Sequence, residues 1–252
     1  MFFPRRFPIA AMILGLAVGN LVAQVPSPRP PGGENVGLLI EQVGVLAYPP
    51  SMTYEAIYSG EARIAISVDA QGKLDDFLVI AYTHEDFAKA AVMALKRWRY
   101  QPALVRGEPR ASRTEILFEF KDQGVIVQNL PGALERRMIM APFGEHYVYA
   151  PCRLSELDEL PEPLDLAKPQ VKGDGHSHTV AVEFYIDEAG LARMPAVDRT
   201  SADDRFAAAA VRAVEQWRFK PPLRKGRAVL VRAQQVFTFE PRTESGSAPK
   251  VP

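Results

Sequence analysis

The sequence predicts an α+β protein made of two small repeats, each a three-stranded antiparallel sheet packed against one helix. Three observations lead to this fold class. A tryptophan motif occurs twice, alternating apolar residues precede it in each copy, and an apolar stripe at helical spacing leads into it. Within each repeat the elements follow in the order strand, strand, helix, strand.

The tryptophan motif shows the duplication most directly. The stretch LKRWRYQPALVRG, residues 95–107, has a counterpart in VEQWRFKPPLRKG, residues 214–226. Each contains Trp-Arg-aromatic-x-Pro, followed by a glycine at the same spacing. Trp98 and Trp217 are the only two tryptophans of the chain and lie 119 residues apart. The motif therefore indicates one structural unit that is used twice.

A β-hairpin is predicted at the start of each repeat. Residues 62–68 and 179–186 alternate apolar side chains with others, which is the period of a half-buried strand. Each strand runs into a turn that opens with aspartate and closes with a glycine able to adopt positive φ, Asp69–Gly72 and Asp187–Gly190. The second returning strand contains Pro195, which lacks an N–H and belongs at a sheet edge or a bulge.

One amphipathic helix is predicted after each hairpin. Thr83 and Ser201 are each followed three residues later by aspartate, a pattern that resembles a capping box. Apolar residues then recur at helical spacing, and alanines among them let the helix lie close to the sheet. Together with the closing strands they form the predicted core, whose large side chains are Phe87, Trp98, Phe118, Phe120, Phe206, Trp217, Phe237 and Phe239.

The closing strands, residues 112–120 and 229–239, each have one neighbour at most in a three-stranded sheet. Their outer N–H and C=O groups meet water, pair with the other repeat and bury the edge, or receive a guest strand. The faces turned away from the predicted core carry mostly polar residues that suit an extended peptide. These candidate partner-binding residues are Arg113, Glu115 and Leu117 in the first strand and Arg232, Gln234 and Thr238 in the second.

Composition limits the classes of partner. The chain has 252 residues, with 30 Lys and Arg against 30 Asp and Glu, so no net charge favours nucleic acid. The single cysteine, Cys152, cannot form an internal disulfide and has no neighbouring Cys or His at metal-ligand spacing. We interpret it as a structural residue.

The first 23 residues have the anatomy of a signal peptide. Arg5 and Arg6 precede an apolar run over residues 9–18, and small residues follow up to Ala23. Because this run is too short to span a bilayer comfortably, we expect cleavage near Gln24 and a periplasmic mature chain. The alternative is an inner-membrane anchor through residues 7–23.

Composition also predicts the remaining boundaries. They are a proline- and glycine-rich tether at 24–36, the two repeats at 37–122 and 160–241, a connector at 123–159 and a disordered tail at 242–252. The connector is too long for a bare loop and contains apolar residues at 125–127 and 137–140. We expect it to pack between the repeats and to fix their orientation.

An enzymatic function would rest on the stretch GDGHSH. His176 and His178 share one face of any strand that they enter, and Asp174 precedes them. His-x-His alone is a weak metal signature, however, and no second His or Cys cluster accompanies it. The sequence also has no Gly-x-Ser-x-Gly elbow and no phosphate-binding glycine loop. We therefore expect a protein that is not an enzyme, with no metal site, no cofactor and no small-molecule substrate.

The order of these motifs resembles the C-terminal domain of TonB. In the first repeat the resemblance covers Tyr48–Pro50, Gly60, Asp69, Gly72, Phe87, the tryptophan motif with Gly107, and Phe118–Phe120. The second repeat keeps Asp187, Gly190, Phe206, the tryptophan motif with Gly226, and Phe237–Phe239. It has no Tyr-Pro at its start, where Leu160–Pro163 stands instead.

The resemblance implies a periplasmic module that pairs with an extended peptide of an envelope protein, such as an outer-membrane transporter, and is linked to TonB-dependent transport. It also implies that Tyr48 and Pro49 lie near the binding edge. The leader has no histidine and the tether is short, unlike those of a TonB-like energy transducer driven by inner-membrane motor components. An anchored transducer and a cell-envelope scaffold of TolA-like character are the alternatives.

Overall fold

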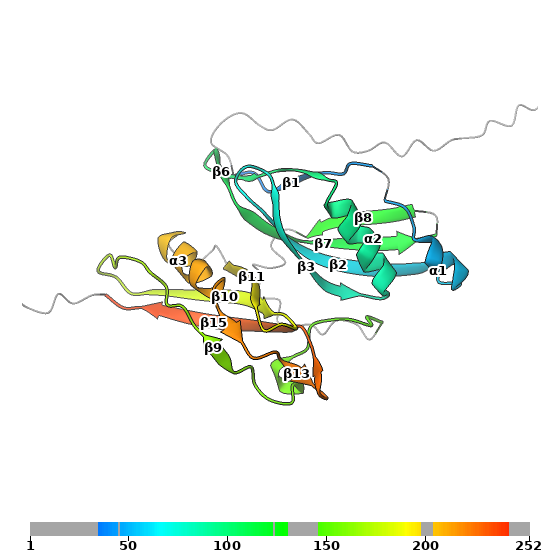
Figure 1. The fold of residues 1–252 in the computed structure, drawn as a ribbon. Helices are drawn as coiled ribbons and strands as arrows, with labels where there is room; N and C mark the ends of the chain where they lie inside the picture. Colours follow the sequence, from blue (N-terminus) through cyan, green and yellow to red (C-terminus); the bar gives the residue numbers. More distant parts are fainter. Residues whose placement is uncertain (1–34, 45, 123, 131–145, 198–203, 242–252) are drawn as a thin grey trace, which may run out of the picture.

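A computed structural model describes residues 35–44, 46–122, 124–130, 146–197 and 204–241. The expected signal peptide, most of the expected tether, the apolar residues 137–140 and the expected tail lie outside this part of the chain. The described residues form an α+β structure with few helices and several antiparallel sheets, arranged as two repeats (Figure 1). The predicted fold class is confirmed.

The first repeat is an antiparallel sheet of four strands in the order β3-β2-β7-β8, with helix α2 against it (Figure 1). These elements are β2 (Ser59–Val68), β3 (Leu74–Tyr82), α2 (Glu85–Leu95), β7 (Ser112–Lys121) and β8 (Gly124–Leu130). The smaller elements are β1 (Leu39–Glu41), α1 (Pro50–Tyr54), β4 (Arg99–Gln101), β5 (Ala103–Val105) and β6 (Glu108–Arg110).

The second repeat has three strands in the order β11-β10-β15, with helix α3 against them. These elements are β10 (His178–Ile186), β11 (Ala192–Val197), α3 (Asp204–Val214) and β15 (Val231–Phe239). The smaller elements are the 3-10 turn η1 (Leu154–Glu156), β9 (Pro163–Asp165), β12 (Arg218–Phe219), β13 (Leu223–Arg224) and β14 (Arg227–Ala228).

The strand count predicted from the sequence fits the second repeat, whereas the first repeat gains a fourth strand from the segment assigned to the connector. In β8, Val125 and Val127 lie opposite Phe120 and Phe118 of β7. Both valines pack against the core of the first repeat. Pairing with β7 therefore extends the apolar face of the sheet by one strand. The short apolar run at 125–127 thus belongs to the sheet of the first repeat and not to the connector.

Both predicted hairpin turns are present and share one hydrogen-bonding pattern. The Asp69 carboxylate accepts from the N–H groups of Gln71 and Lys73, at 2.9 and 2.8 Å. Gly72 and Gly190 have φ of +81° and +82°. A Cβ on Gly190 would lie 2.0 Å from the carbonyl oxygen of Phe219, so this glycine also allows the turn to approach the chain after Trp217.

Two local predictions meet different outcomes. Pro195 lies in β11, an edge strand, beside a shift in its register with β10, as expected. The N-cap of α2 is His84 and not Thr83, because the His84 ring accepts from the Asp86 N–H. The Thr83 hydroxyl instead accepts from the Glu61 N–H at 2.9 Å and ties the chain to β2. Ser201 lies outside the described residues.

Each repeat has its own core between sheet and helix, and these cores contain the predicted aromatic side chains. Six of the eight are buried: Phe87, Trp98, Phe118, Phe120, Phe206 and Trp217. Phe237 and Phe239 pack against the second core but remain half-buried. The duplicated tryptophans are thus core residues in both repeats.

A third apolar cluster joins the repeats through the sheet faces that lie opposite the helices. It contains Ala65, Leu78 and Ile80 from the first repeat and Tyr185, Met194, Ala196 and Leu230 from the second. The alternation of β2 and β10 placed Ala65 and Tyr185 on the outward faces, yet both are buried here. The two sheets therefore shield their outer faces against each other.

The end of the expected connector strengthens this junction. Tyr149 packs against the third cluster and stacks on Tyr82, with ring centroids 5.0 Å apart. Its carbonyl accepts from the Tyr82 N–H at 3.0 Å, and its hydroxyl bonds Glu188 of the second repeat. Residue 149 thus contacts both repeats, as expected for a connector that fixes their orientation.

Replacement of the turn glycine should show how closely the second hairpin depends on this geometry. A positive φ costs an L-residue about 1–2 kcal/mol, and Gly190→Ala adds a clash with backbone, so we expect a loss of about 3 kcal/mol or more in the free energy of unfolding. Gly226→Ala is the matched control, because φ is +72° and nothing lies within 4 Å of the added carbon. It should cost only about 1 kcal/mol. Equal losses in chemical denaturation would contradict the close approach.

Candidate functional site

Strand β15 offers an open sheet edge. It is the last strand of the β11-β10-β15 sheet. At its start, Val231 forms a parallel bridge with Cys152, whose N–H donates to the Leu230 carbonyl at 2.8 Å. From Arg232 to Phe239, no strand in the described part of the chain pairs with its outer side. Over these eight residues, every second residue therefore presents its backbone N–H and C=O groups to an incoming strand.

The corresponding edge of the first repeat is closed. Strand β7 pairs with β2 on one side and with β8 on the other. The expectation that both closing strands lie at a sheet edge is therefore wrong for the first repeat. The physical reason is that β8 supplies both the missing backbone partners and two valines that cover the aromatic pair of β7.

The pair of phenylalanines on each closing strand differs in burial between the two repeats. Phe118 and Phe120 of β7 are 0% and 1% exposed. Their counterparts in β15, Phe237 and Phe239, are half-buried. The rings already contact the core, with Phe237 5.6 Å from Trp217 and Phe239 5.0 Å from Phe206 between centroids. The open edge therefore leaves apolar surface beside unpaired backbone.

The opposite face of β15 carries the three residues predicted for partner binding. Arg232 forms an ion pair with Glu183 on the neighbouring strand, so its charge is already satisfied. Gln234 and Thr238 are exposed. The sequence prediction missed Val236, which lies between them and is also exposed; the two-residue alternation around Gln234 was the signal that could have found it.

The three candidates on β7 instead face the junction between the repeats or the interior of the sheet. Arg113 donates to Glu215 of the second repeat at 2.5 Å. Glu115 is buried, and Leu117 is half-buried with Gln128 of β8 as its neighbour across the strand pair. The structure does not bring them together with the exposed residues of β15.

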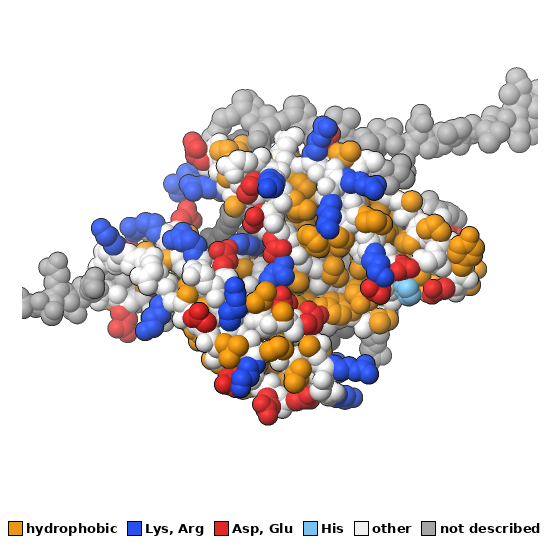
Figure 2. Space-filling model, in the orientation of Figure 1, with side chains coloured by type: hydrophobic (Ala, Val, Ile, Leu, Met, Phe, Trp, Pro, Cys, Tyr) orange, Lys and Arg blue, Asp and Glu red, His pale blue; other side chains and the backbone are white. Residues whose placement is uncertain are grey.

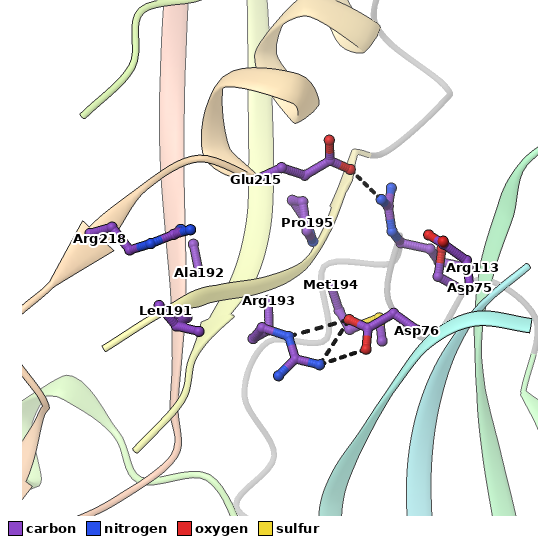
Figure 3. A pocket seen from close by; sticks show the side chains of 11 residues that line it. Asp75, Asp76, Arg113, Leu191, Ala192, Arg193, Met194, Pro195, Glu215 and Arg218 are labelled. Carbon is purple, nitrogen blue, oxygen red and sulfur yellow. Dashed lines mark hydrogen bonds and ion pairs between the residues drawn. The ribbon is translucent and has the colours of Figure 1, made fainter. Parts of the chain in front are cut away.

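A cleft between the repeats is lined by ion pairs that join the first repeat to the second (Figure 3). Arg193 of β11 reaches Asp76 of β3, with a shortest distance of 2.7 Å. Nearby, Arg113 extends toward Glu215. The cleft has a volume of about 250 Å³. Its opposite charges neutralise each other across the junction, so the cleft contributes to holding the repeats together.

Glu115 is the most strongly buried carboxylate of this junction, at 5% exposed. Its Oε1 lies 3.4 Å from Nε of Arg63, and Arg232 and Tyr185 of the second repeat face it. Burial raises the pKa of Glu115, and the two arginines oppose that shift only in part. A charged carboxylate here therefore carries a desolvation cost.

Tyr48 and Pro49 lie in the first repeat, on the helix side of its sheet. Tyr48 donates from its hydroxyl to the Ile57 carbonyl at 2.5 Å, and its ring meets that of Phe87 edge-on at 5.5 Å. Pro49 is the N-cap position of α1. Both residues line a groove along α2, and neither belongs to the open edge of β15.

Two segments of the chain, residues 46–121 and 170–241, match the Gram-negative bacterial TonB protein C-terminal family. Together they cover more than half of the sequence. The chain belongs to the TonB C-terminal domain family. A search of curated proteins found no match. Each TonB-like segment lies within one structural repeat, and domains of this family serve protein interaction in the cell envelope.

The stretch GDGHSH lies at the start of β10 in the second TonB-like repeat. His178 stacks on Phe206 at 4.1 Å, and its Nε2 lies 2.8 Å from Asp174. Asp174 also accepts from the His176 N–H at 3.0 Å. Within the described ranges, no group of three or more His, Cys, Asp or Glu residues could hold a metal ion.

The surface of the TonB-like repeats carries both signs of charge. Figure 2 shows basic and acidic side chains interspersed over the face that it presents. This distribution agrees with the balanced composition of the chain. In the part of the chain that the structure describes, no helix is long and apolar enough to cross a membrane.

The buried carboxylate of the first TonB-like repeat gives a pH prediction. Because the folded pKa of Glu115 is raised above its ordinary value of about 4.3, the folded chain binds more protons than the unfolded chain between the two values. The stabilising effect is present below the unfolded pKa and is lost as pH rises through the folded pKa. Denaturation of wild type and Glu115→Gln should show wild type losing stability relative to the variant as pH rises from about 4. A relative gain over that range would contradict the assignment.

Proposed function

We propose that the second TonB-like repeat captures an extended peptide of an envelope protein by strand addition to β15. The single observation that carries this proposal is the open edge from Arg232 to Phe239. Strand addition draws affinity from main-chain hydrogen bonds and specificity from alternate side chains. Both are available on β15, which offers unpaired backbone with half-buried phenylalanines on one face and exposed polar residues on the other.

Strand β8 supports the proposal as an example of a fitting strand within the same chain. It runs antiparallel to β7 over seven residues and places Val127 and Val125 against Phe118 and Phe120. The equivalent aromatic residues of β15 have no such cover in the described structure. A guest with aliphatic residues at alternate positions would bury Phe237 and Phe239 in the same manner, at a gain of about 25 cal/mol for each Å² of apolar surface.

The first repeat has a different role in this proposal. Its closing edge is occupied by β8, so capture is assigned to the second repeat alone. The first repeat holds β10 and β11, and with them the sheet that ends in β15, through the shared apolar cluster and through the Arg193–Asp76 ion pair. A peptide partner would thus meet an edge that is already fixed, which lowers the entropy lost on binding.

The partner is assigned to the envelope by family membership and by the leader. Domains of this family serve envelope protein interaction. The expected export signal in residues 1–23, which lie outside the described residues, supports the same compartment. An outer-membrane transporter with an extended periplasmic segment is the class of partner that combines both features, which links the protein to TonB-dependent transport.

A synthetic peptide with the sequence of β8, residues 124–130, is the probe for strand addition. In an antiparallel pair, N–H groups of adjacent residues point to opposite sides. Of the adjacent variants Gln234→Pro and Gln235→Pro, one therefore removes a bond to β10 and the other removes only an outward donor. The variant that keeps the wild-type circular dichroism spectrum should lose peptide binding at least about tenfold in calorimetric titration. Unchanged affinity in that folded variant would refute strand addition to β15.

A further inference from the structure

The second feature with the character of a binding site is a groove along the outer side of α2 in the first repeat. It has a volume of about 380 Å³ and lies between the helix and the segment that leads into α1. Its apolar lining includes Val43, Leu46, Tyr48, Met93, Ala94 and Trp98. Met93 is 58% exposed, so a large apolar side chain of the helix is left open to solvent.

The second repeat fills the corresponding place with its own chain. Strand β9 pairs Asp165 with Arg218, as β1 pairs Glu41 with Arg99. Two residues after Asp165, the Ala167 carbonyl accepts from the indole N–H of Trp217 at 2.8 Å. Ala167 and Val171 then pack against the core. The extended segment after β9 therefore closes the groove of the second repeat.

The first repeat has the same elements but leaves the groove open. Val43 follows Glu41 at the position where Ala167 follows Asp165. Among the described residues, nothing accepts a hydrogen bond from the Trp98 indole, which lines the groove. A polar N–H at the wall of an apolar groove favours a ligand that brings an acceptor.

The helices of the two repeats carry different residues at two positions that line the open groove of the first repeat. Met93 of α2 corresponds to Arg212 of α3, so the repeat with the closed groove has a charged residue where the other has an apolar one. Arg97, which lines the open groove, corresponds to Gln216. Arg97 is exposed, and no acidic residue in the described structure pairs with it. Asp86 and Lys89 also line the groove and pair with each other, so the first repeat combines an apolar floor with one exposed cation, Arg97, at its rim.

We propose that this groove is a second peptide-binding site, which takes an extended segment of a partner protein independently of β15. The segment after β9 shows the binding mode: a backbone carbonyl accepts from the tryptophan indole while small or aliphatic side chains cover the helix. The ligand of the first repeat places an aliphatic residue over Met93 and an acidic residue near Arg97. Charge complementarity with Arg97 favours an acidic partner peptide over the chain's own tether, residues 24–36, whose Arg29 and Glu34 leave it without net charge.

A peptide based on residues 163–171, PLDLAKPQV, with Lys168→Ala to leave Asp165 as its charged side chain, is the probe, because it contains the segment that covers Trp217 in the second repeat. The chain gives two indole signals in a nitrogen–proton correlation spectrum, and Trp217→Phe identifies which one belongs to Trp98. Added peptide should shift the Trp98 signal saturably and leave the Trp217 signal in place. Absence of a saturable shift at millimolar peptide would overturn the proposal.

Two matched variants exchange the residues in which the helices differ. Met93→Arg lies at an exposed position and should weaken peptide binding at least about tenfold while the spectrum stays folded. Arg212→Met should leave binding unchanged, because Ala167 already occupies the second groove. Equal binding by wild type and Met93→Arg would overturn the proposal. Two other results would also overturn it. A Trp98 signal that moves with protein concentration would indicate that a second copy of the chain occupies the groove. A Trp98 signal that moves when residues 24–34 are removed would indicate that the tether occupies it.

Discussion

The structure depends on how the two closing strands satisfy their outer backbone groups. A strand with one neighbour exposes a row of N–H and C=O groups that will pair with any suitable strand. In the first repeat β8 fills this position and completes a four-stranded sheet. In the second repeat, the outer side of β15 has one partner among the described residues, the bridge from Val231 to Cys152. One duplicated unit thus contains a closed edge and an open edge, and the open edge carries the proposed function.

The duplication serves as an internal reference, because each repeat closes the surface that the other leaves open. The sheet edge is closed by β8 in the first repeat, and the helix groove is closed by the segment around Ala167 in the second. The apolar cluster between the sheets and the contacts of Tyr149 hold the two repeats against each other. We infer that a partner meets an open edge and an open groove in a fixed relation, which favours binding at two points by raising local concentration.

Much of the fold follows from local sequence. The hairpins, their Asp-x-x-Gly turns, the helices after them and the aromatic core could be predicted because each depends on periodicity or turn chemistry within a few residues. Strand β8 could not, because Val125–Val127 is a short apolar run whose partner on β7 is fixed only by tertiary pairing. The packing of the two sheet faces against each other was also missed, since Glu115 and Arg232 occupy positions that alternation assigns to solvent. On β15, alternation correctly placed Gln234 and Thr238 on the face away from the core, whereas the groove depends on the tertiary path of the chain around Trp98.

Amide hydrogen exchange with and without the β8 peptide, residues 124–130, tests the central claim most directly, because it follows both closing strands in one experiment. The account predicts that the peptide slows exchange at outward amides between Arg232 and Phe239. It also predicts that amides of Ser112–Lys121 are protected before the peptide is added and do not change. New protection on β7, with release of Gly124–Leu130 and no change on β15, would contradict the account.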